Sequence, residues 1–270
     1  MEWQYISSKS NALIVRVAKL KDKKYRKNEG LFRFDGIKLF YEAAKIGAPI
    51  EYVFVSESAR DKYCIEVESN CICDKLFVIS NDAFMKLTDE QSPEGIITVC
   101  KNLNNITFES DINSLATSLV GKRVLLLESV RDVGNMGTII RTARAFGIDA
   151  LVISSDCADL YNPKTIRAAM GALFTQRIAI VDSISSIVLA MQSEGARVFA
   201  AALQRDAKKL GEIELNLGDA ILIGNEGHGL SEEAISSCDE CVYIPMEESS
   251  ESLNAGVAAS VCMWELYKTK

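Results

Sequence analysis

The sequence has few of the features that mark secreted or membrane proteins. Only 7% of its 270 residues are aromatic, and it contains four prolines and one histidine. No apolar run reaches the roughly 18 residues that a membrane-spanning helix needs, so none is predicted. The N-terminus lacks a basic start followed by an apolar stretch, which predicts no secretory signal and a cytoplasmic location. Hydrophobic residues form 48% of the chain, which is enough for a packed core and argues against disorder.

The eight cysteines do not form the pattern of a disulfide framework in a chain of this length. Cys238 and Cys241 have the spacing of half a zinc site, but the second half would have to come from Cys71 and Cys73 or from His228. No second pair has metal-ligand spacing, so reduced thiols and no metal are predicted. The remaining cysteines are Cys64, Cys100, Cys157 and Cys262.

Positive charge is concentrated at one end of an acidic chain. The net charge is −7, yet residues 1–49 carry 11 Lys and Arg against 5 Asp and Glu. A polyanion responds to such a local field over about one Debye length, roughly 8–10 Å. The basic stretch therefore predicts an RNA contact, with a solvated surface helix as the alternative. The candidate residues here are Arg16, Lys21, Lys23, Lys24, Arg26 and Lys27.

The first hundred residues are predicted to form a small α/β module. Apolar strands are expected at 31–36, 51–57, 75–80 and 95–100, and helices at 37–47 and 81–88. A polar stretch rich in Asn and Ser follows and predicts a linker. The expected division is an N-terminal domain at 1–105, a linker at 106–120 and a C-terminal domain at 121–270.

The second half alternates short apolar runs with helical segments. The runs are rich in Val, Ile and Leu and lack period-two alternation, which predicts a parallel sheet covered on both faces. They lie at 123–129, 150–154, 177–181, 197–203, 220–224 and 241–245. The helical segments lie at 136–147, 163–174, 183–195, 231–237 and 252–267. The predicted fold class is therefore α/β.

The first segment that carries chemistry follows the strand at 123–129. A loop containing Gly134, Asn135 and Gly137 leads into a helix that bears Arg141 and Arg144. Two arginines three residues apart share a helix face, and beside a helix N-terminus they could clamp a phosphate. An ordinary solvated face is the alternative. The spacing is not the G-x-G-x-x-G of a dinucleotide site, which argues against a redox enzyme.

The second segment is the glycine-rich stretch after the strand at 220–224. Gly224, Gly227 and Gly229 allow a close approach of the backbone to a ligand. Glu226 follows the carboxyl end of a parallel strand, where open α/β sheets bind ligands. The alternative is a turn with a solvent-facing Glu. His228 could act as an acid or base, but a lone loop imidazole is more often merely exposed.

The third segment begins where the strand at 241–245 ends in Pro245. A polar loop follows, and Ser252 or Asn254 opens the last helix. The small residues Ala255 and Gly256 allow that helix to approach a ligand or another backbone closely. Taken alone, this segment would be only a loop and a helix cap.

In this order and spacing, the three segments resemble the signature motifs of the SpoU (TrmH) family of RNA 2′-O-methyltransferases. The resemblance extends from Arg123 to Tyr267. The N-terminal module is similar to the ribosomal-protein-like RNA-binding domain that precedes the catalytic domain in ribosomal RNA members. The chain departs from the usual pattern at Val133, where the family has Pro, and at Ala255 and Gly256, which replace Val and Ser.

The resemblance implies a SPOUT fold, in which the C-terminal parallel-sheet domain contains a deep trefoil knot, and a homodimer whose site is completed at the interface. It implies S-adenosylmethionine as cofactor, held by Leu222, Gly224, Ile244, Met246, Ser252 and Leu253. The implied catalytic residues are Arg141, Asn135, Glu226 and Asn254. Arg141 is the family's proposed general base, but an arginine pKa above about 12 leaves a positioning role open.

The implied substrate is structured RNA, most often ribosomal (23S) RNA, with transfer RNA as the alternative because only the N-terminal module separates them. A non-catalytic RNA-binding protein of the same fold is a further alternative. The intact set of four polar residues argues against it. The sequence does not identify the nucleotide that is modified.

Overall fold

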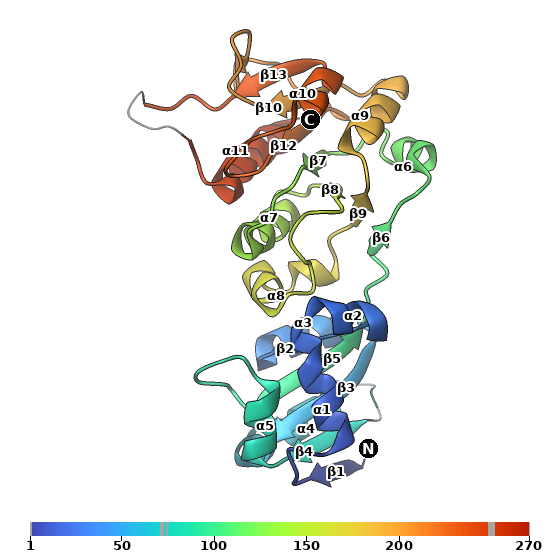
Figure 1. Ribbon diagram of the computed structural model, residues 1–270, viewed down its shortest axis with the longest axis vertical. Helices are drawn as coiled ribbons and strands as arrows, with labels where there is room; N and C mark the ends of the chain where they lie inside the picture. Colours follow the sequence, from blue (N-terminus) through green and yellow to red (C-terminus); the bar gives the residue numbers. More distant parts are fainter. Residues whose placement is uncertain (1, 71–72, 74, 248–251, 270) are drawn as a thin grey trace. The chain divides into compact units, whose positions relative to one another are not determined.

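The structure, a computed structural model, describes residues 2–70, 73, 75–247 and 252–269. The chain forms two compact units (Figure 1). The first contains the chain up to Asn104 together with residues 161–174, and the second contains residues 105–160 and the chain from Thr175 onward. Both units contain sheets and helices, so the predicted α/β class is confirmed.

The sheet of the first unit has five strands in the order β1-β4-β3-β5-β2. β3 and β1 pair parallel with β4, whereas β5 pairs antiparallel with β3 and β2. The strands are β1 (Trp3–Ile6), β2 (Leu31–Asp35), β3 (Ile50–Ser56), β4 (Leu76–Ile79) and β5 (Ile96–Lys101). Successive residues of β3 point to opposite faces: Phe54 belongs to one core cluster, and Val53 and Val55 belong to another.

Helices cover both faces of this sheet. α1 (Ala12–Ala18) and α5 (Asn81–Leu87) pack with the cluster around Phe54. α3 (Ile37–Lys45) and α4 (Arg60–Asn70) pack with the cluster around Val53. The basic stretch of the sequence forms α1, the 3₁₀ turn η1 (Lys19–Lys21) and α2 (Lys23–Glu29). A further 3₁₀ turn, η2 (Glu57–Ala59), leads into α4.

Residues 161–174 belong to the first unit although they lie far along the chain. They contain α8 (Pro163–Ala169) and the 3₁₀ turn η3 (Ala172–Phe174). The ring of Tyr161 stacks on Phe32 with centroids 4.4 Å apart, and Phe174 contacts Phe34 at 5.3 Å. This segment therefore packs against β2, so residues 161–174 belong to the first unit of the structure although they lie within the range 121–270 expected for the C-terminal domain.

The second unit is built on eight strands that pair only in parallel, in the order β11-β13-β10-β12-β7-β8-β9-β6. This confirms the predicted parallel sheet. The strands are β6 (Ile106–Phe108), β7 (Val124–Leu127), β8 (Ala150–Ser154), β9 (Ile178–Val181), β10 (Val198–Ala201), β11 (Lys208–Lys209), β12 (Ala220–Ile223) and β13 (Glu240–Tyr243). Because β12 lies beside β7, the carboxyl ends of these strands, Leu127 and Ile223, are adjacent.

Helices also cover both faces of this larger sheet. α6 (Ile112–Ser118), α9 (Ile184–Ser193) and α10 (Glu232–Ser237) share one core with Val124, Leu126 and their neighbours. α7 (Val133–Ala145) and α11 (Ala255–Lys268) pack against each other (Figure 1). None of the helices in the described ranges has the length and apolar character to cross a bilayer.

The predicted linker at 106–120 is wrong. Ile106–Phe108 pairs with β9 as an edge strand, and Ile112–Ser118 forms α6, whose N-cap Asp111 accepts a hydrogen bond from the Ser114 amide at 3.0 Å. The stretch is polar because its strand and helix are short and largely exposed, so composition alone concealed them.

Candidate active site

The first motif leaves the sheet at the end of β7 and enters α7. Ser129 has φ +55°, a left-handed conformation that is rare outside glycine and turns the chain sharply. Asp132 then caps the helix, because its carboxylate accepts a hydrogen bond from the Asn135 amide at 2.7 Å. The helix begins at Val133, three residues earlier than the sequence predicted. Asn135 therefore lies in its first turn, at the carboxyl edge of the sheet.

Side chains from all three motifs meet in one hydrogen-bonded chain. Asn135 donates from Nδ2 to Oε1 of Glu226 at 2.7 Å and accepts at Oδ1 from Nδ2 of Asn254 at 2.9 Å. The Glu226 carboxylate can only accept, so it fixes the orientation of the Asn135 amide. That orientation leaves the Asn135 oxygen for Asn254. Three of the four predicted catalytic residues are thus in direct contact.

Asn254 also starts the last helix. Its Oδ1 accepts hydrogen bonds from the amides of Gly256 and Val257 at 3.0 and 3.3 Å, as an N-cap residue does. A Cβ on Gly256 would lie 3.2 Å from Asn254 Oδ1 and 3.4 Å from Asn135 Oδ1. The small residue at 256 therefore lets α11 begin against the Asn135 side chain.

The second motif forms a tight hairpin. Asn225 and Gly229 exchange two backbone hydrogen bonds of 3.0 Å. Gly224 lies directly against the returning strand: a Cβ there would be 2.4 Å from the Gly229 carbonyl carbon and 2.5 Å from the Leu230 nitrogen. Only glycine fits at position 224, whereas a Cβ at Gly227 would meet its nearest neighbour at an ordinary van der Waals distance.

Arg141 lies farther along α7, with its side chain exposed. Within the described part of the chain it makes no hydrogen bond or ion pair, so its guanidinium is available to a substrate. Arg144, one turn later, is also exposed. Among the described residues, the fourth candidate therefore has no hydrogen bond to the Glu226–Asn135–Asn254 chain.

The predicted cofactor residues follow two strands and precede a helix. Leu222 is buried in β12 and Gly224 follows it, whereas Ile244 and Met246 follow β13 and Ser252 and Leu253 precede Asn254. Met246 is 39% exposed although it is apolar. Among the described residues, the main chain of 244–247 makes no protein hydrogen bond. Free backbone groups beside apolar side chains suit a nucleoside cofactor held by the main chain.

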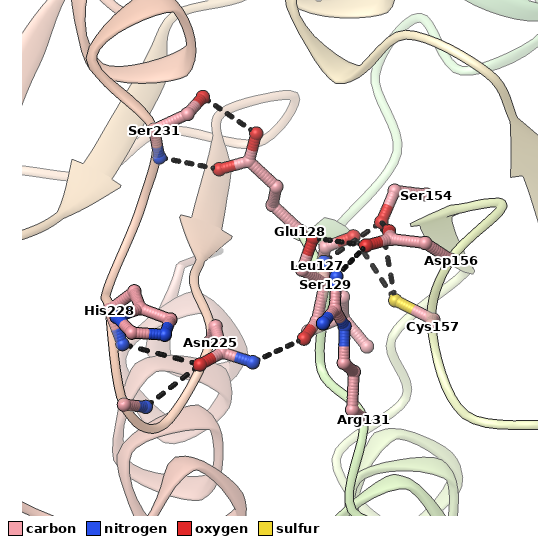
Figure 2. A network of polar contacts seen from close by, with 11 residues as sticks. Leu127, Glu128, Ser129, Arg131, Ser154, Asp156, Cys157, Asn225, His228 and Ser231 are labelled. Carbon is pink, nitrogen blue, oxygen red and sulfur yellow. Dashed lines mark hydrogen bonds and ion pairs between the residues drawn. The ribbon is translucent and has the colours of Figure 1, made fainter.

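A second polar network, which the sequence did not reveal, joins the first two motifs (Figure 2). Asn225 donates from Nδ2 to the Ser129 carbonyl at 2.7 Å. Asp156 accepts from the hydroxyls of Ser129 and Ser154, each at 2.6 Å, and from Arg131 at 2.8 Å. Burial opposes ionisation of Asp156, but these partners outweigh it and lower its pKa to about 2.

The basic residues of the first unit fall into two groups. Arg26 is buried and donates to the carbonyls of Leu20 and Lys21, each at 2.6 Å, so the structure contradicts its assignment as an RNA contact. Arg16 is ion-paired with Glu29 at 2.5 Å. The candidates with exposed side chains that make no described hydrogen bond or ion pair are Lys21, Lys23, Lys24 and Lys27.

The cysteines described by the structure are free thiols; Cys71 lies outside the described residues. Burial raises the pKa of Cys238 and Cys262 to about 12. In the described ranges, no three His, Cys, Asp or Glu side chains gather as a metal site would require.

Comparison with known proteins identifies the class of this fold and site. The model of the SpoU rRNA Methylase family matches residues 122–264, and that of an MRM3-like substrate binding domain matches residues 11–98. The chain belongs to the SpoU rRNA Methylase family. The predictions of a methyltransferase, of S-adenosylmethionine as its methyl donor and of the SPOUT fold are confirmed.

Individual relatives match nearly the whole chain. It is 33% identical over 262 residues to 23S rRNA (guanosine(2553)-2′-O)-methyltransferase RlmP of Bacillus subtilis, covering 97% of this chain and 98% of that one. It is 29% identical over 196 residues to 23S rRNA (guanosine-2′-O-)-methyltransferase RlmB of Coxiella burnetii, covering 73% and 78%. The solved structure of AviRb from Streptomyces viridochromogenes with AdoMet is 25% identical, with a TM-score of 0.82 and coverage of 96% and 97%.

Proposed function

We propose that this protein transfers the methyl group of S-adenosylmethionine to a ribose 2′-OH of 23S ribosomal RNA. The observation that carries the proposal is the Glu226–Asn135–Asn254 chain, which joins the three motifs at one edge of the sheet. The names of the relatives from Bacillus subtilis and Coxiella burnetii support ribosomal RNA as the substrate.

The cofactor supplies an electrophilic methyl on a sulfonium. Holding the hydroxyl in line with it can provide much of the rate enhancement, up to roughly 7–11 kcal/mol in favourable cases. Arg141 is assigned to the hydroxyl and an adjacent phosphate, because its guanidinium is exposed and uncommitted. Glu226 and Asn254 hold the Asn135 amide between them, so that this edge of the site is rigid before substrate binds.

The lysines of η1 and α2 are assigned to the RNA backbone. Lys21, Lys23, Lys24 and Lys27 are exposed and lie within seven residues, so they can release several counterions from phosphates together. This reaction requires RNA, so we place the protein in the cytoplasm. The proposed chemistry uses no metal.

A homodimer is also proposed. Phe146, which follows α7, and Trp264 and Tyr267 of α11 form an aromatic cluster with ring centroids 5.6–5.8 Å apart. Trp264 and Tyr267 remain 46% and 49% exposed. A contiguous exposed apolar patch marks an interaction site, and a second copy of this chain would bring its own α11 to it. Trp264→Glu is expected to give a monomer in light scattering.

The function is tested by mapping 2′-O-methylation in ribosomal and transfer RNA from cells with and without this protein. One ribosomal position should lose its methyl group and regain it when purified protein and S-adenosylmethionine are added. Loss confined to transfer RNA would favour the tRNA alternative. An unchanged map, with RNA binding retained, would favour a non-catalytic binding protein.

A further inference from the structure

A cavity of about 250 Å³ lies beside the catalytic edge of the second unit. It opens between the turn after β7 and the hairpin after β12. The same hairpin contains Glu226, which directly follows the lining residue Asn225. Its lining includes Glu128, Ser129, Arg131, Asn225, His228 and Ser231. Pockets for drug-sized ligands begin at roughly 300 Å³, so this cavity suits a group no larger than one nucleobase.

The walls of the cavity are fixed by bonds between the two loops (Figure 2). Glu128 accepts at Oε2 from the Ser231 amide and at Oε1 from the Ser231 hydroxyl, both at 2.8 Å. On the other side, Asn225 is bonded to the Ser129 carbonyl at 2.7 Å. The left-handed Ser129 that links these bonds is the kind of strained residue that persists where a site requires it.

The polar groups of the cavity are held in position but still have hydrogen-bond donors and acceptors available for a ligand. Arg131 is bound through Nη2 to Asp156, which is itself held by two serine hydroxyls. Its side chain is 68% exposed, and a guanidinium has five N–H donors. The Glu128 carboxylate likewise has acceptor sites beyond the two taken by Ser231. The cavity therefore offers a fixed donor and a fixed acceptor.

Resting on the proposed function, we propose that this cavity receives a guanine, the base of the nucleotide whose ribose is methylated. Guanine carries the acceptors O6 and N7 beside the donors N1–H and N2–H₂, which match Arg131 and Glu128 respectively. Adenine and cytosine place an amino donor where Arg131 also donates, and uracil lacks the second donor. His228 at the hairpin supplies a ring on which an unstacked base can lie.

Because the cavity lies close to Glu226, the base that it holds should belong to the nucleotide whose own ribose is methylated. A base is bonded directly to its own ribose, and Asn225 of the cavity directly precedes Glu226. An enzyme that modifies one nucleotide in a structured RNA must take it out of the stack, and it reads the extruded base by hydrogen bonds to its edge. The cavity would therefore select the target nucleotide and position its ribose together.

The test uses the full chain, S-adenosylmethionine and an unmodified 23S rRNA transcript. The methylated nucleotide is mapped first, and a synthetic fragment is then made with guanosine, inosine or 7-deazaguanosine at that position. Inosine lacks only the N2 amino group, and 7-deazaguanosine lacks only the N7 acceptor. Wild-type kcat/KM should fall by about tenfold to a hundredfold with either analogue.

Two variants test which side chain makes each contact with the base. Glu128→Gln should remove the preference for guanosine over inosine, and Arg131→Met should remove the preference for guanosine over 7-deazaguanosine. Glu194→Gln is the matched control, because the Glu194 carboxylate accepts from the Thr117 hydroxyl at 2.8 Å elsewhere in the unit. It should discriminate as wild type does. If one variant fails to fold, the other still tests the cavity.

The outcomes separate the two proposals. A target other than guanosine, analogues that react as fast as guanosine, or variants that keep the wild-type preferences would each overturn the guanine cavity alone. Absence of methyl transfer to any ribosomal RNA by the wild-type protein would overturn the proposed function and the cavity with it. A mapped guanosine whose analogue preferences disappear in the matching variants supports the cavity.

Discussion

Replacing either of two glycines in the hairpin segment by alanine adds one methyl group, but the two replacements should have opposite effects on stability. A Cβ on Gly224 would lie 2.4–2.6 Å from three backbone atoms of Gly229 and Leu230. A Cβ on Gly227 would meet only Asn225 Oδ1, at the ordinary distance of 3.5 Å. Gly224→Ala must therefore displace the backbone, whereas Gly227→Ala needs no movement.

The expected size follows from these distances. Overpacking costs about 1–3 kcal/mol, and the lower chain entropy of alanine in the unfolded state offsets about 0.4–1 kcal/mol. With the midpoints of these ranges the net cost is about 1.3 kcal/mol, so Gly224→Ala should lower Tm by roughly 3–5 °C, at about 2–4 °C per kcal/mol for a unit of this size. Gly227→Ala should leave Tm unchanged or slightly raised.

Cofactor binding should separate the two variants further. A shifted hairpin moves Leu222 and Gly224, so Gly224→Ala should weaken S-adenosylmethionine binding at least tenfold by calorimetry, while Gly227→Ala binds as wild type does. Equal melting temperatures and equal Kd values for the two variants would refute the close crossing at Gly224.

Other predictions concern catalysis, RNA affinity and acid stability. Arg141→Ala should leave S-adenosylmethionine binding intact but lower single-turnover methyl transfer at saturating RNA by two orders of magnitude or more, and Arg141→Lys should not restore it; a near wild-type rate would make Arg141 only a binding residue. Replacing the four exposed lysines of η1 and α2 by Gln should flatten the dependence of log affinity on log salt, whereas an unchanged slope would make them a solvated surface. The lowered pKa of Asp156, about 2 against an ordinary 3.8, stabilises the fold above about pH 4 and is lost as the pH falls toward 2. The Tm difference between wild type and Asp156→Asn should therefore close over that range, and a difference independent of pH would contradict the assigned ion pair and hydrogen bonds.

The sequence was sufficient to locate the candidate site because its residues stand at the ends of recognisable strands. Glu226 and Asn135 follow β12 and β7, and parallel strands deliver their carboxyl ends to one edge. It could not predict that Asn135 would connect Glu226 with Asn254, since those partners lie 91 and 119 positions away. Nor did any local pattern mark Asp156, which acts through bonds to other loops. The deep knot stays a prediction.

Long-range packing also explains the errors. A basic stretch at helical spacing gives no sign that Arg26 turns back to the carbonyls of η1 instead of facing solvent. The strand at Ile106–Phe108 exists because β9, about 70 residues later, offers an edge on which to pair. A three-residue polar-flanked strand has too little periodicity to be recognised before its partner is known.

The packing of residues 161–174 onto β2 sets an order of folding. Phe32 and Phe34 are made early, but Tyr161 and Phe174, which pack against them, emerge about 130 residues later. At roughly 5–20 residues per second, ribosomal synthesis leaves that aromatic surface without these partners for about 6–26 seconds. The N-terminal unit therefore cannot finish folding on its own; its last pieces arrive with the middle of the chain, after β6, β7 and β8 of the second unit but before the remaining five strands of its sheet.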